Sequence, residues 1–229
     1  MTSISKTPSA AVFCFSFGGL AIALLAAGAL ISGCRSSDKS MDSTSMARAQ
    51  PRPLPSPVKA VWVARFHYYH PADICTIIRN CAALGFNTIL WQVRGSGTVA
   101  YPSRIEPWSA EYGHQDPGFD PLQIAVEEAH RRGLRIEAWV NVMPGWRGPK
   151  APPIKNQLWH TRPEWFLRDA AGNRQPLGRF YLILNPGLPE VRRYVTSVVG
   201  EIVTSYDVDG IHLDYVRYPD VLPFSPGLR

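Results

Sequence analysis

The feature that most constrains the fold of this chain is the alternation of apolar, β-rich runs with helical patterns between residues 58 and 213. Strand-type runs are expected at 58–66, 86–93, 134–142 and 208–213. Between them, one helical pattern runs from Pro71 to Gly85, one from Asp120-Pro121 to Gly133, and one over 189–205. Strands that alternate with helices in this way lie parallel and are joined by right-handed crossovers.

This order predicts an α/β fold of the (β/α)8 TIM-barrel type. The long loops all follow strands, which in such a barrel places them on the carboxyl-terminal face, where active sites lie. The four strands and their helices occupy about 160 residues, whereas a complete barrel takes ~250 residues. The segment after Pro219 is short and contains Pro223, Pro226 and Gly227. We therefore expect a partial barrel over residues 58–219, truncated after the fourth strand, and an irregular tail over residues 220–229.

Residues 1–34 have the pattern of an export signal. An uncharged apolar run over residues 10–31 follows Lys6 and ends in Ile31-Ser32-Gly33-Cys34. A small-residue site directly before a cysteine resembles the bacterial lipobox, in which the cysteine is acylated and becomes the first residue after cleavage. The run is also just long enough for an uncleaved transmembrane anchor. Both alternatives place the folded part outside the cytoplasm, and the lipobox predicts a membrane-anchored lipoprotein of the bacterial cell envelope with a lipid on Cys34.

Residues 35–57 are expected to form a disordered tether between the lipid site and the barrel. This stretch is rich in Ser, Asp, Lys, Arg and Pro. Its run Pro51-Arg52-Pro53-Leu54-Pro55 favours extended polyproline geometry. The apolar content is too low to support a folded core.

Charge and cysteine usage narrow the partners that this chain can have. The formal net charge is +6, but the basic residues are scattered along helices and loops without a dense run, which argues against nucleic acid as a partner. Cys75 and Cys81 are separated by six residues on one helical pattern and diverge around it, which predicts free, buried thiols. No cysteine and histidine spacing typical of a metal site occurs, so we expect neither a metal nor another cofactor.

The clearest chemical signal lies on the expected fourth strand, in the block Asp209-Gly210-Ile211-His212-Leu213-Asp214. Alternation along a strand puts His212 and Asp214 on one face and Ile211 and Leu213 on the other. If the aliphatic pair packs against the outer helices, Asp214 points into the barrel at its carboxyl-terminal mouth. Cleavage of a glycosidic bond needs a carboxylate there, to attack or stabilise an oxocarbenium-like carbon. An aspartate that only caps the next turn explains the position equally well.

Five blocks of the sequence resemble the glycosyl-hydrolase-like family 10 group. The blocks are Val61-Trp62-Val63-Ala64; Leu84-Gly85-Phe86-Asn87-Thr88 with Gln92-Val93-Arg94; Tyr101-Pro102-Ser103 with Glu106-Pro107-Trp108-Ser109; Glu127-Glu128-Ala129-His130 through Ala138-Trp139-Val140-Asn141; and Asn185-Pro186-Gly187 through Tyr218-Pro219. They occur in the family's order over residues 59–219. The family includes a lipoprotein that hydrolyses denuded peptidoglycan strands, so the resemblance implies a barrel that acts on envelope glycan.

The resemblance also implies a role for Asp214 as the catalytic nucleophile. The block around it is similar to that of alpha-amylases, in which the last Asp of an Asp-Gly-x-x-x-Asp strand is the nucleophile. The acid/base carboxylate of such enzymes follows on a later strand, which the expected partial barrel lacks. Glu137 is the internal substitute, and alternation places it on the same face of the third strand as Trp139 and Asn141. Related sequences often have His in place of Glu137, and a buried partner for an arginine is an alternative role. A retaining pair needs carboxyl groups ~5–5.5 Å apart.

Six further residues are expected to bind the substrate: Gln92, Arg94, Trp139, Asn141, His212 and Tyr215. The resemblance implies that Asn141 contacts a sugar hydroxyl, with a plain turn contact as the alternative. Gln92 is expected to bond sugar hydroxyls and Arg94 to keep Asp214 ionised by charge pairing, unless Arg94 forms a structural ion pair. The planes of loop aromatics suit the apolar faces of sugar rings, and two or three of seven are expected to contact a sugar: Tyr68, Tyr69, Trp108, Trp146, Trp159, Trp165 and Tyr215.

We thus expect a glycoside hydrolase-like lipoprotein that cleaves cell-envelope glycan, peptidoglycan strands above all, by carboxylate chemistry. Because the expected partial barrel lacks a second carboxylate, we expect this chain alone to cleave glycan very slowly or not at all. The alternative is a non-catalytic carbohydrate-binding lipoprotein or a degenerate fragment of such an enzyme.

Overall fold

The computed structural model describes residues 52–169 and 171–219. The expected signal peptide with Cys34, residues 35–51 of the expected tether and the expected tail over 220–229 lie outside the described residues. All described residues belong to one compact unit. No helix in the described ranges is long and apolar enough to cross a membrane.

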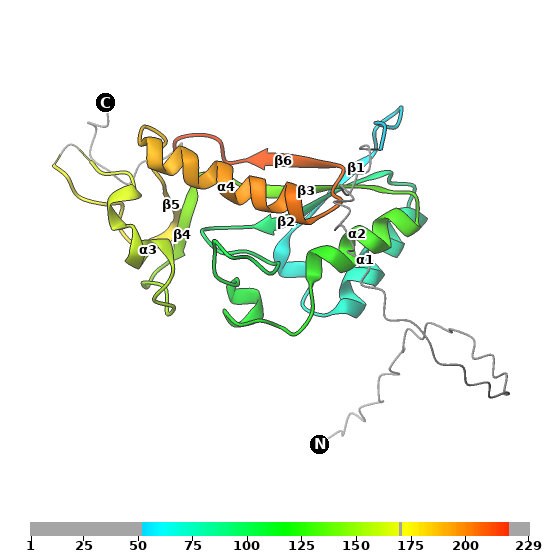
Figure 1. Cartoon of the computed structure of the whole chain (residues 1–229), viewed down its shortest axis with the longest axis horizontal. Helices are drawn as coiled ribbons and strands as arrows, with labels where there is room; N and C mark the ends of the chain where they lie inside the picture. Colours follow the sequence, from blue (N-terminus) through cyan, green and yellow to red (C-terminus); the bar gives the residue numbers. More distant parts are fainter. Residues whose placement is uncertain (1–51, 170, 220–229) are drawn as a thin grey trace, which may run out of the picture. The chain divides into compact units, whose positions relative to one another are not determined.

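Four parallel strands form the central sheet, in the order β1-β2-β3-β6 (Figure 1). The strands are β1 (Ala60–Val63), β2 (Thr88–Arg94), β3 (Arg135–Asn141) and β6 (Gly210–Asp214). The helices that precede the last three of them are α1 (Pro71–Ala83), α2 (Pro121–Arg131) and α4 (Pro189–Ser205). Strand order therefore follows chain order, as in the wall of a barrel. The predicted parallel α/β sheet is confirmed, although the strands begin one or two residues later than expected.

The first two helices begin where polar side chains satisfy their free backbone N–H groups. At the start of α2, the Asp120 carboxylate accepts hydrogen bonds from the backbone N–H groups of Leu122 and Gln123, both at 3.0 Å. At the start of α1, His70 and Asp73 form a reciprocal capping box. The predicted cap at Asp120-Pro121 is thus confirmed, and these caps fix where the chain leaves each preceding loop.

The hydrophobic core lies between the sheet and the first two helices. Alternate residues of the central strands are fully buried there: Ile89, Trp91 and Val93 of β2, and Ile136, Ala138 and Val140 of β3. They pack against the inner sides of α1 and α2, including Ile74, Ile78, Leu122, Ala125 and Ala129. Each large side chain buried in this way contributes about 1.5–3 kcal/mol. Both cysteines of α1 are free thiols; Cys81 is buried as expected, whereas Cys75 is only half-buried.

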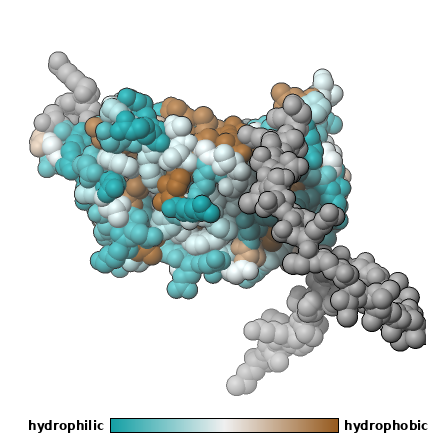
Figure 2. All heavy atoms as spheres, viewed as in Figure 1, coloured by the Kyte–Doolittle hydropathy of each residue, from teal (hydrophilic) through white to brown (hydrophobic). Residues whose placement is uncertain are grey.

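Strand β6 departs from the expected burial pattern. Ile211 packs against the core as predicted, but Leu213 is 52% exposed. The reason is position, because β6 is an edge strand of the described sheet and only its inner neighbour β3 flanks it. Apolar surface is visible over this edge in Figure 2.

The sheet is curved, so its second face is concave. β1 and β6 are the two outermost strands, yet the indole N–H of Trp62 on β1 donates a hydrogen bond of 3.2 Å to Nε2 of His212 on β6. The two rings meet edge to face, with centroids 5.8 Å apart. Side chains of opposite edges can meet in this way only if the strands wrap around a common axis, as they do in a barrel.

The loop between β3 and α4 contains elements that the sequence did not predict. β4 (Pro144–Gly148) and β5 (Gly178–Ile183) form an antiparallel hairpin, and α3 (Leu158–Thr161) and η3 (Pro163–Trp165) lie between them. The remaining short helices, η1 (Arg65–His67) and η2 (Ala110–Tyr112), follow β1 and β2. The hairpin has its own apolar cluster, formed by Trp146, Leu158, Phe166, Leu182, Leu184 and Val191. In Figure 1 this lobe lies beyond the carboxyl ends of the parallel strands.

The last six residues of the expected tether differ from a disordered segment. Arg52 donates hydrogen bonds to the Asp209 carboxylate from its backbone N–H at 3.2 Å and from its guanidinium at 3.3 Å. Its backbone carbonyl accepts a hydrogen bond from Arg135. Asp209 directly precedes β6, and Arg135 opens β3, so residues 52–57 attach to the amino-terminal end of the sheet. The polar composition of residues 52–57 did not predict this attachment, because the contacts are ionic rather than apolar.

Candidate active site

Asp214 is the last residue of β6 and lies at the carboxyl end of the sheet. Its backbone is fixed by parallel pairing, since Asn141 is its neighbour in register and its carbonyl accepts a 2.8 Å hydrogen bond from the N–H of Val142. The half-buried carboxylate accepts hydrogen bonds from the Trp139 indole N–H at 3.1 Å and from the backbone N–H of Tyr215 at 2.7 Å. Both of these donors are neutral groups, and no salt bridge to Asp214 is present within the ranges that the structure describes.

Tyr215 follows with a backbone conformation that few side chains adopt. Its φ is 51°, in the left-handed region that normally favours glycine. Such a conformation costs on the order of 1–3 kcal/mol and persists only where the surroundings impose it. Here the imposed contacts are the hydrogen bond to Asp214 and a 3.4 Å hydrogen bond from the N–H of Met143 to the Tyr215 carbonyl. The turn directs the chain sharply away from the strand just after the carboxylate.

The concave face next to Asp214 carries aromatic and imidazole groups. Trp139 and His212 are neighbours in register on β3 and β6, and their rings lie edge to face with centroids 6.4 Å apart. Trp62 completes the row from the opposite edge of the sheet and is 57% exposed. The sequence placed Trp139 and His212 on this face correctly. Within the described ranges, no group of three or more His, Cys, Asp or Glu side chains is arranged to hold a metal ion.

Glu137 does not serve as the second carboxylate for Asp214. It is in register with Gly210, four residues before Asp214, which corresponds to about 13 Å along a strand. Its carboxylate instead lies 3.4 Å from the guanidinium of Arg135, so the alternative of an arginine partner describes it better. A Cβ at residue 210 would lie 3.2 Å from the Glu137 side chain, so the glycine makes room for it.

Arg94 does not pair with Asp214 either. It is 1% exposed, and its guanidinium forms a salt bridge of 2.7 Å with the buried carboxylate of Glu106. The remaining guanidinium nitrogen donates to the backbone carbonyls of Asn141 and Val142. Burial alone would lower the pKa of Arg94, but the adjacent Glu106 carboxylate outweighs that effect and raises it. The structural ion pair, which was the alternative, is therefore what the structure has.

Gln92 lies on the concave face but is almost fully buried. Its side-chain carbonyl accepts hydrogen bonds from the backbone N–H of Arg65 at 3.2 Å and from the Arg65 guanidinium at 3.3 Å. Arg65 in turn pairs with Glu111 at 3.2 Å. The Arg65–Glu111 pair at the mouth was missed, because neither residue lies in a run with a recognisable period. The predicted contact of Gln92 with sugar hydroxyls stays a prediction.

Asn141 is 1% exposed, and neither polar atom of its side chain has a hydrogen-bond partner. Buried amide groups without partners are rare and call for an explanation such as a bound group or water. Asn141 is in register with Asp214, so this unsatisfied amide lies on the strand beside the carboxylate. The turn contact that was its alternative role is absent from the described residues.

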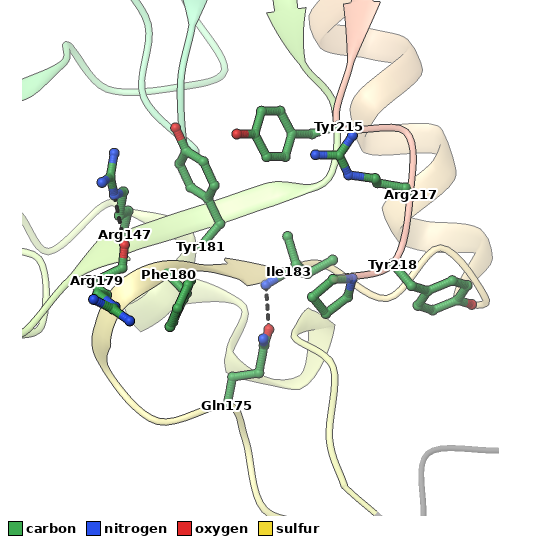
Figure 3. A pocket seen from close by; sticks show the side chains of 10 residues that line it. Arg147, Gln175, Arg179, Phe180, Tyr181, Ile183, Tyr215, Arg217 and Tyr218 are labelled. Atoms are coloured by element: carbon green, nitrogen blue, oxygen red, sulfur yellow. Dashed lines mark hydrogen bonds between the residues drawn. The ribbon is translucent and has the colours of Figure 1, made fainter. Parts of the chain in front are cut away.

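A cavity of about 400 Å³ lies between the β4–β5 hairpin and the residues that follow Asp214 (Figure 3). Its lining combines arginines with aromatic rings: Arg147, Arg179, Arg217, Phe180, Tyr181, Tyr215 and Tyr218. The rings of Tyr181 and Tyr215 lie edge to face at 4.9 Å and join the two walls. Except for Tyr215, sequence reasoning missed these residues, because the hairpin strands lack the apolar alternation that marks a strand.

The other loop aromatics that attract attention in the sequence have different surroundings. Tyr68 is fully buried and stacks on Trp91, and Trp146 is buried in the hairpin cluster. Trp159 packs edge to face against Phe166. Of these loop aromatics, Tyr215 is the one that lines the cavity beside Asp214.

An outer layer of helices, a curved parallel sheet and an accessible carboxylate at the carboxyl end of a strand define a barrel-type α/β protein with a candidate active site at that end of the sheet. Sequence comparison then gives the family. The chain belongs to the glycosyl hydrolase-like 10 family, whose model matches residues 57–225. The family resemblance inferred from the sequence blocks is thereby confirmed.

Two relatives carry the same description of a glycosyl hydrolase. DigH of Escherichia coli K12 is 36% identical over 160 residues, which cover 64% of this chain and 33% of DigH. YngK of Bacillus subtilis is 33% identical over 160 residues, which cover 62% of this chain and 27% of YngK. The chain thus spans a third or less of the length of these relatives.

Comparison of folds agrees with the barrel assignment. Alpha-L-fucosidase isoenzyme 2 from Paenibacillus thiaminolyticus matches with a TM-score of 0.50 at 21% identity, covering 68% of this chain and 23% of the fucosidase. The TIM-barrel type of fold is therefore shown for the matched part. The truncation after the fourth strand stays a prediction.

Proposed function

We propose that this protein is an exported glycoside hydrolase that cleaves cell-envelope glycan, specifically peptidoglycan strands, with Asp214 as the carboxylate at the reacting carbon. The family and its relatives support a glycan-acting hydrolase. Peptidoglycan as substrate rests on the sequence resemblance and on the export signal over residues 1–34.

The observation that carries the proposal is the environment of Asp214. The carboxylate is half-buried at the carboxyl end of β6, and two neutral donors, the Trp139 indole and the Tyr215 backbone N–H, fix its orientation. A carboxylate that is oriented but not neutralised by a cation retains its negative charge for an oxocarbenium-like carbon. The Trp139 and Tyr215 rings beside it offer planes for the apolar faces of a sugar.

A second candidate function is carbohydrate binding without catalysis. One observation favours it: the second carboxylate considered, Glu137, lies about 13 Å along the strands from Asp214, beyond the ~5–9.5 Å that separates the carboxyls of glycosidases. A binding protein would retain the aromatic and cationic lining beside Asp214 and would release no product.

Turnover of denuded glycan separates the two candidates. The full chain is incubated with amidase-treated peptidoglycan, and released oligosaccharides are measured by mass spectrometry, beside Asp214→Asn and the control Asp207→Asn. Asp207 is an exposed aspartate before the amino end of β6, far from the mouth in register. The hydrolase predicts products from the wild type and from Asp207→Asn but not from Asp214→Asn. Binding without products in all three proteins would replace the hydrolase by the binding protein.

We further propose that Cys34 is acylated and anchors the protein to a membrane. The motif Ile31-Ser32-Gly33-Cys34 at the end of the apolar run supports this. Cells that express the wild type or Cys34→Ala are fed labelled palmitate, with Cys14→Ala as the matched control. Label on the wild type and on Cys14→Ala, but not on Cys34→Ala, is expected. Equal labelling of all three proteins would refute the lipid site.

A further inference from the structure

The cavity between the β4–β5 hairpin and the residues after β6 has an unusual charge composition. Arg147 and Arg179 are exposed at its wall, and neither forms an ion pair with a carboxylate within the described residues. Acidic side chains are missing from the described lining as well. Seven other arginines within the described ranges do have a carboxylate partner: Arg52, Arg65, Arg94, Arg131, Arg132, Arg135 and Arg193. Arg147 and Arg179 therefore place two positive charges on this wall, and neither is neutralised by a carboxylate of the described residues.

Both arginines are held in position by the hairpin. Arg147 Nε donates a 3.0 Å hydrogen bond to the backbone carbonyl of Arg179, which links β4 to β5. The Arg147 guanidinium lies 5.3 Å from the centre of the Tyr181 ring, and that of Arg179 lies 4.9 Å from the centre of the Phe180 ring. Stacking on aromatic rings leaves the N–H groups at the edge of each guanidinium directed elsewhere. Figure 3 shows Arg147 and Arg179 together on one side of the view, with Tyr181 between them and Tyr215.

The opposite wall comes from the residues directly after Asp214. Tyr215 contributes its ring, which meets that of Tyr181 edge to face at 4.9 Å. Burial raises the pKa of Tyr215, and the neighbouring Tyr181 and Asp214 raise it further, so the phenol stays a protonated donor at neutral pH. Tyr215 follows Asp214 in the chain, so this wall of the cavity begins one residue after that carboxylate, which is not itself part of the lining. The cavity of about 400 Å³ falls in the range of small-ligand sites.

We propose that this cavity is a subsite for a sugar residue that carries a carboxylate, with Arg147 and Arg179 as the residues that recognise the acid and Tyr181 and Tyr215 as the walls for the ring. Guanidinium groups bind carboxylates through paired, charge-assisted hydrogen bonds, and aromatic planes pack on the apolar faces of pyranose rings. This inference rests on the proposed function in placing the acidic sugar within a glycan beside Asp214. The carboxylate can belong to a uronic acid or to the lactyl group of a muramic acid without its peptide.

Direct binding of monosaccharides tests the subsite without requiring hydrolysis. The full chain is titrated with N-acetylmuramic acid and glucuronic acid, and with their neutral counterparts N-acetylglucosamine and glucose, by calorimetry or ligand-detected NMR. An acid is expected to bind about 10-fold more tightly than its neutral counterpart at low ionic strength, with the difference shrinking as salt is added. Preference for both acids indicates recognition of the carboxylate alone, and preference for the muramic acid only indicates the lactyl group. No preference for either acid would overturn the subsite.

A pair of matched variants separates local recognition from overall charge. Arg147→Gln with Arg179→Gln removes both proposed recognition groups, whereas Arg79→Gln with Arg193→Gln removes two exposed arginines on α1 and α4. Both double variants lower the net charge equally. The first is expected to bind acids and neutral sugars alike, and the second to retain the wild-type preference. Loss of preference in both, or in neither, would refute the assignment to Arg147 and Arg179.

Glycan turnover keeps this inference distinct from the proposed function. Denuded strands are compared with the same strands after carbodiimide amidation of their carboxyl groups. Equal turnover of both substrates would overturn the subsite while the hydrolase stands. A preference for acidic monosaccharides in a protein that cleaves neither substrate would leave the subsite standing and remove the proposed hydrolase.

Discussion

Glu106 and Asp214 are two carboxylates held at the same end of the sheet, and their surroundings differ in every respect. Glu106 is buried and receives a salt bridge from Arg94 and a 2.7 Å hydrogen bond from the hydroxyl of Tyr194. Asp214 is half-buried, and among the described residues its hydrogen-bond donors are an indole N–H and the backbone N–H of the next residue. The Arg94 guanidinium is therefore paired with Glu106, a carboxylate with a structural role. Asp214 is left as an oriented anion that solvent or a substrate can reach.

The two carboxylates therefore differ in role: Glu106 stabilises the fold, whereas Asp214 is the residue proposed for the chemistry. Burial raises the pKa of the Tyr194 phenol, and the Glu106 charge raises it further, so this hydroxyl remains a donor to Glu106. Arg94 also donates hydrogen bonds to the backbone carbonyls of Asn141 and Val142, which links β2 to the carboxyl end of β3. The Arg94–Glu106 pair thus holds the frame on which Asp214 is presented.

The largest effect is expected for Asp214→Asn, measured as turnover of denuded glycan. Loss of the anion at the reacting carbon should abolish whatever turnover the wild type shows, including the slow turnover expected of this chain alone. Stability should fall by only about 1 kcal/mol, because an asparagine oxygen still accepts from one of the two donors. Urea unfolding of the same protein provides the control. If Asp214→Asn retained most of the wild-type activity, Asp214 would not be the catalytic carboxylate.

Glu106→Gln is expected to show the opposite profile. It leaves the Arg94 guanidinium buried without a counter-charge, which should lower the free energy of unfolding by about 3–5 kcal/mol. Urea denaturation measures the change, with Glu190→Gln as the control, since Glu190 forms only an exposed pair with Arg193 on α4. A change below about 1 kcal/mol for Glu106→Gln would mean that the buried pair does not hold the frame.

A third carboxylate, Asp209, extends the comparison to the amino end of the sheet. Burial alone would raise its pKa, but hydrogen bonds from the N–H of Ile136, from His130 and from the N–H of Arg52 lower it below the ordinary value. A depressed pKa stabilises the fold above the unfolded value of about 4, and this contribution is lost as the pH falls through the folded value.

Asp209→Asn should therefore cost about 1–2 kcal/mol at pH 7 and flatten the decline of stability in acid below about pH 4. Thermal unfolding of the variant and the wild type across the acid range measures this difference. Asp116→Asn is the control, since Asp116 is an exposed aspartate in the loop between η2 and α2. Parallel acid profiles of wild type and Asp209→Asn would contradict the assignment.

The smallest effect is expected for Trp139→Phe, which keeps an aromatic ring and removes the indole donor to Asp214. Loss of one hydrogen bond to a charged group corresponds to about 1–1.5 kcal/mol, or roughly a 5- to 10-fold drop in kcat. KM should change little because the ring remains available to the sugar. Trp159→Phe, in the hairpin cluster, is the matched substitution. A change confined to KM would make Trp139 a binding residue rather than one that positions Asp214.

The fold was predictable from the sequence because its signals are local. Alternating apolar residues on β2 and β3, and the cap at Asp120, each specify an element without reference to distant residues. The β4–β5 hairpin was not predictable in this way, since its strands are short and contain Pro144, Gly145, Gly148 and Gly178. Its stability comes from an apolar cluster collected over residues 146–191, which no local window shows.

The site was predictable only as far as strand alternation extends. Alternation placed Trp139, His212 and Asp214 on one face correctly. It also placed Glu137 there, but register then put that residue too deep, beside Gly210. The partner of Arg94 depended on a loop residue, Glu106, twelve positions further along the chain. Ion pairs across a loop depend on the tertiary structure, so they cannot be predicted from the pattern of a single sequence.

The left-handed backbone at Tyr215 has a consequence for how the protein would evolve. Glycine or asparagine would relax this position and so favour the folded state, but either would remove one wall of the cavity next to Asp214. A library selected for heat resistance alone should therefore enrich glycine or asparagine at residue 215, whereas a library selected for growth on its glycan should retain tyrosine. Such a difference between the two selections would show that Tyr215 lowers the stability of the fold and is retained because of its function.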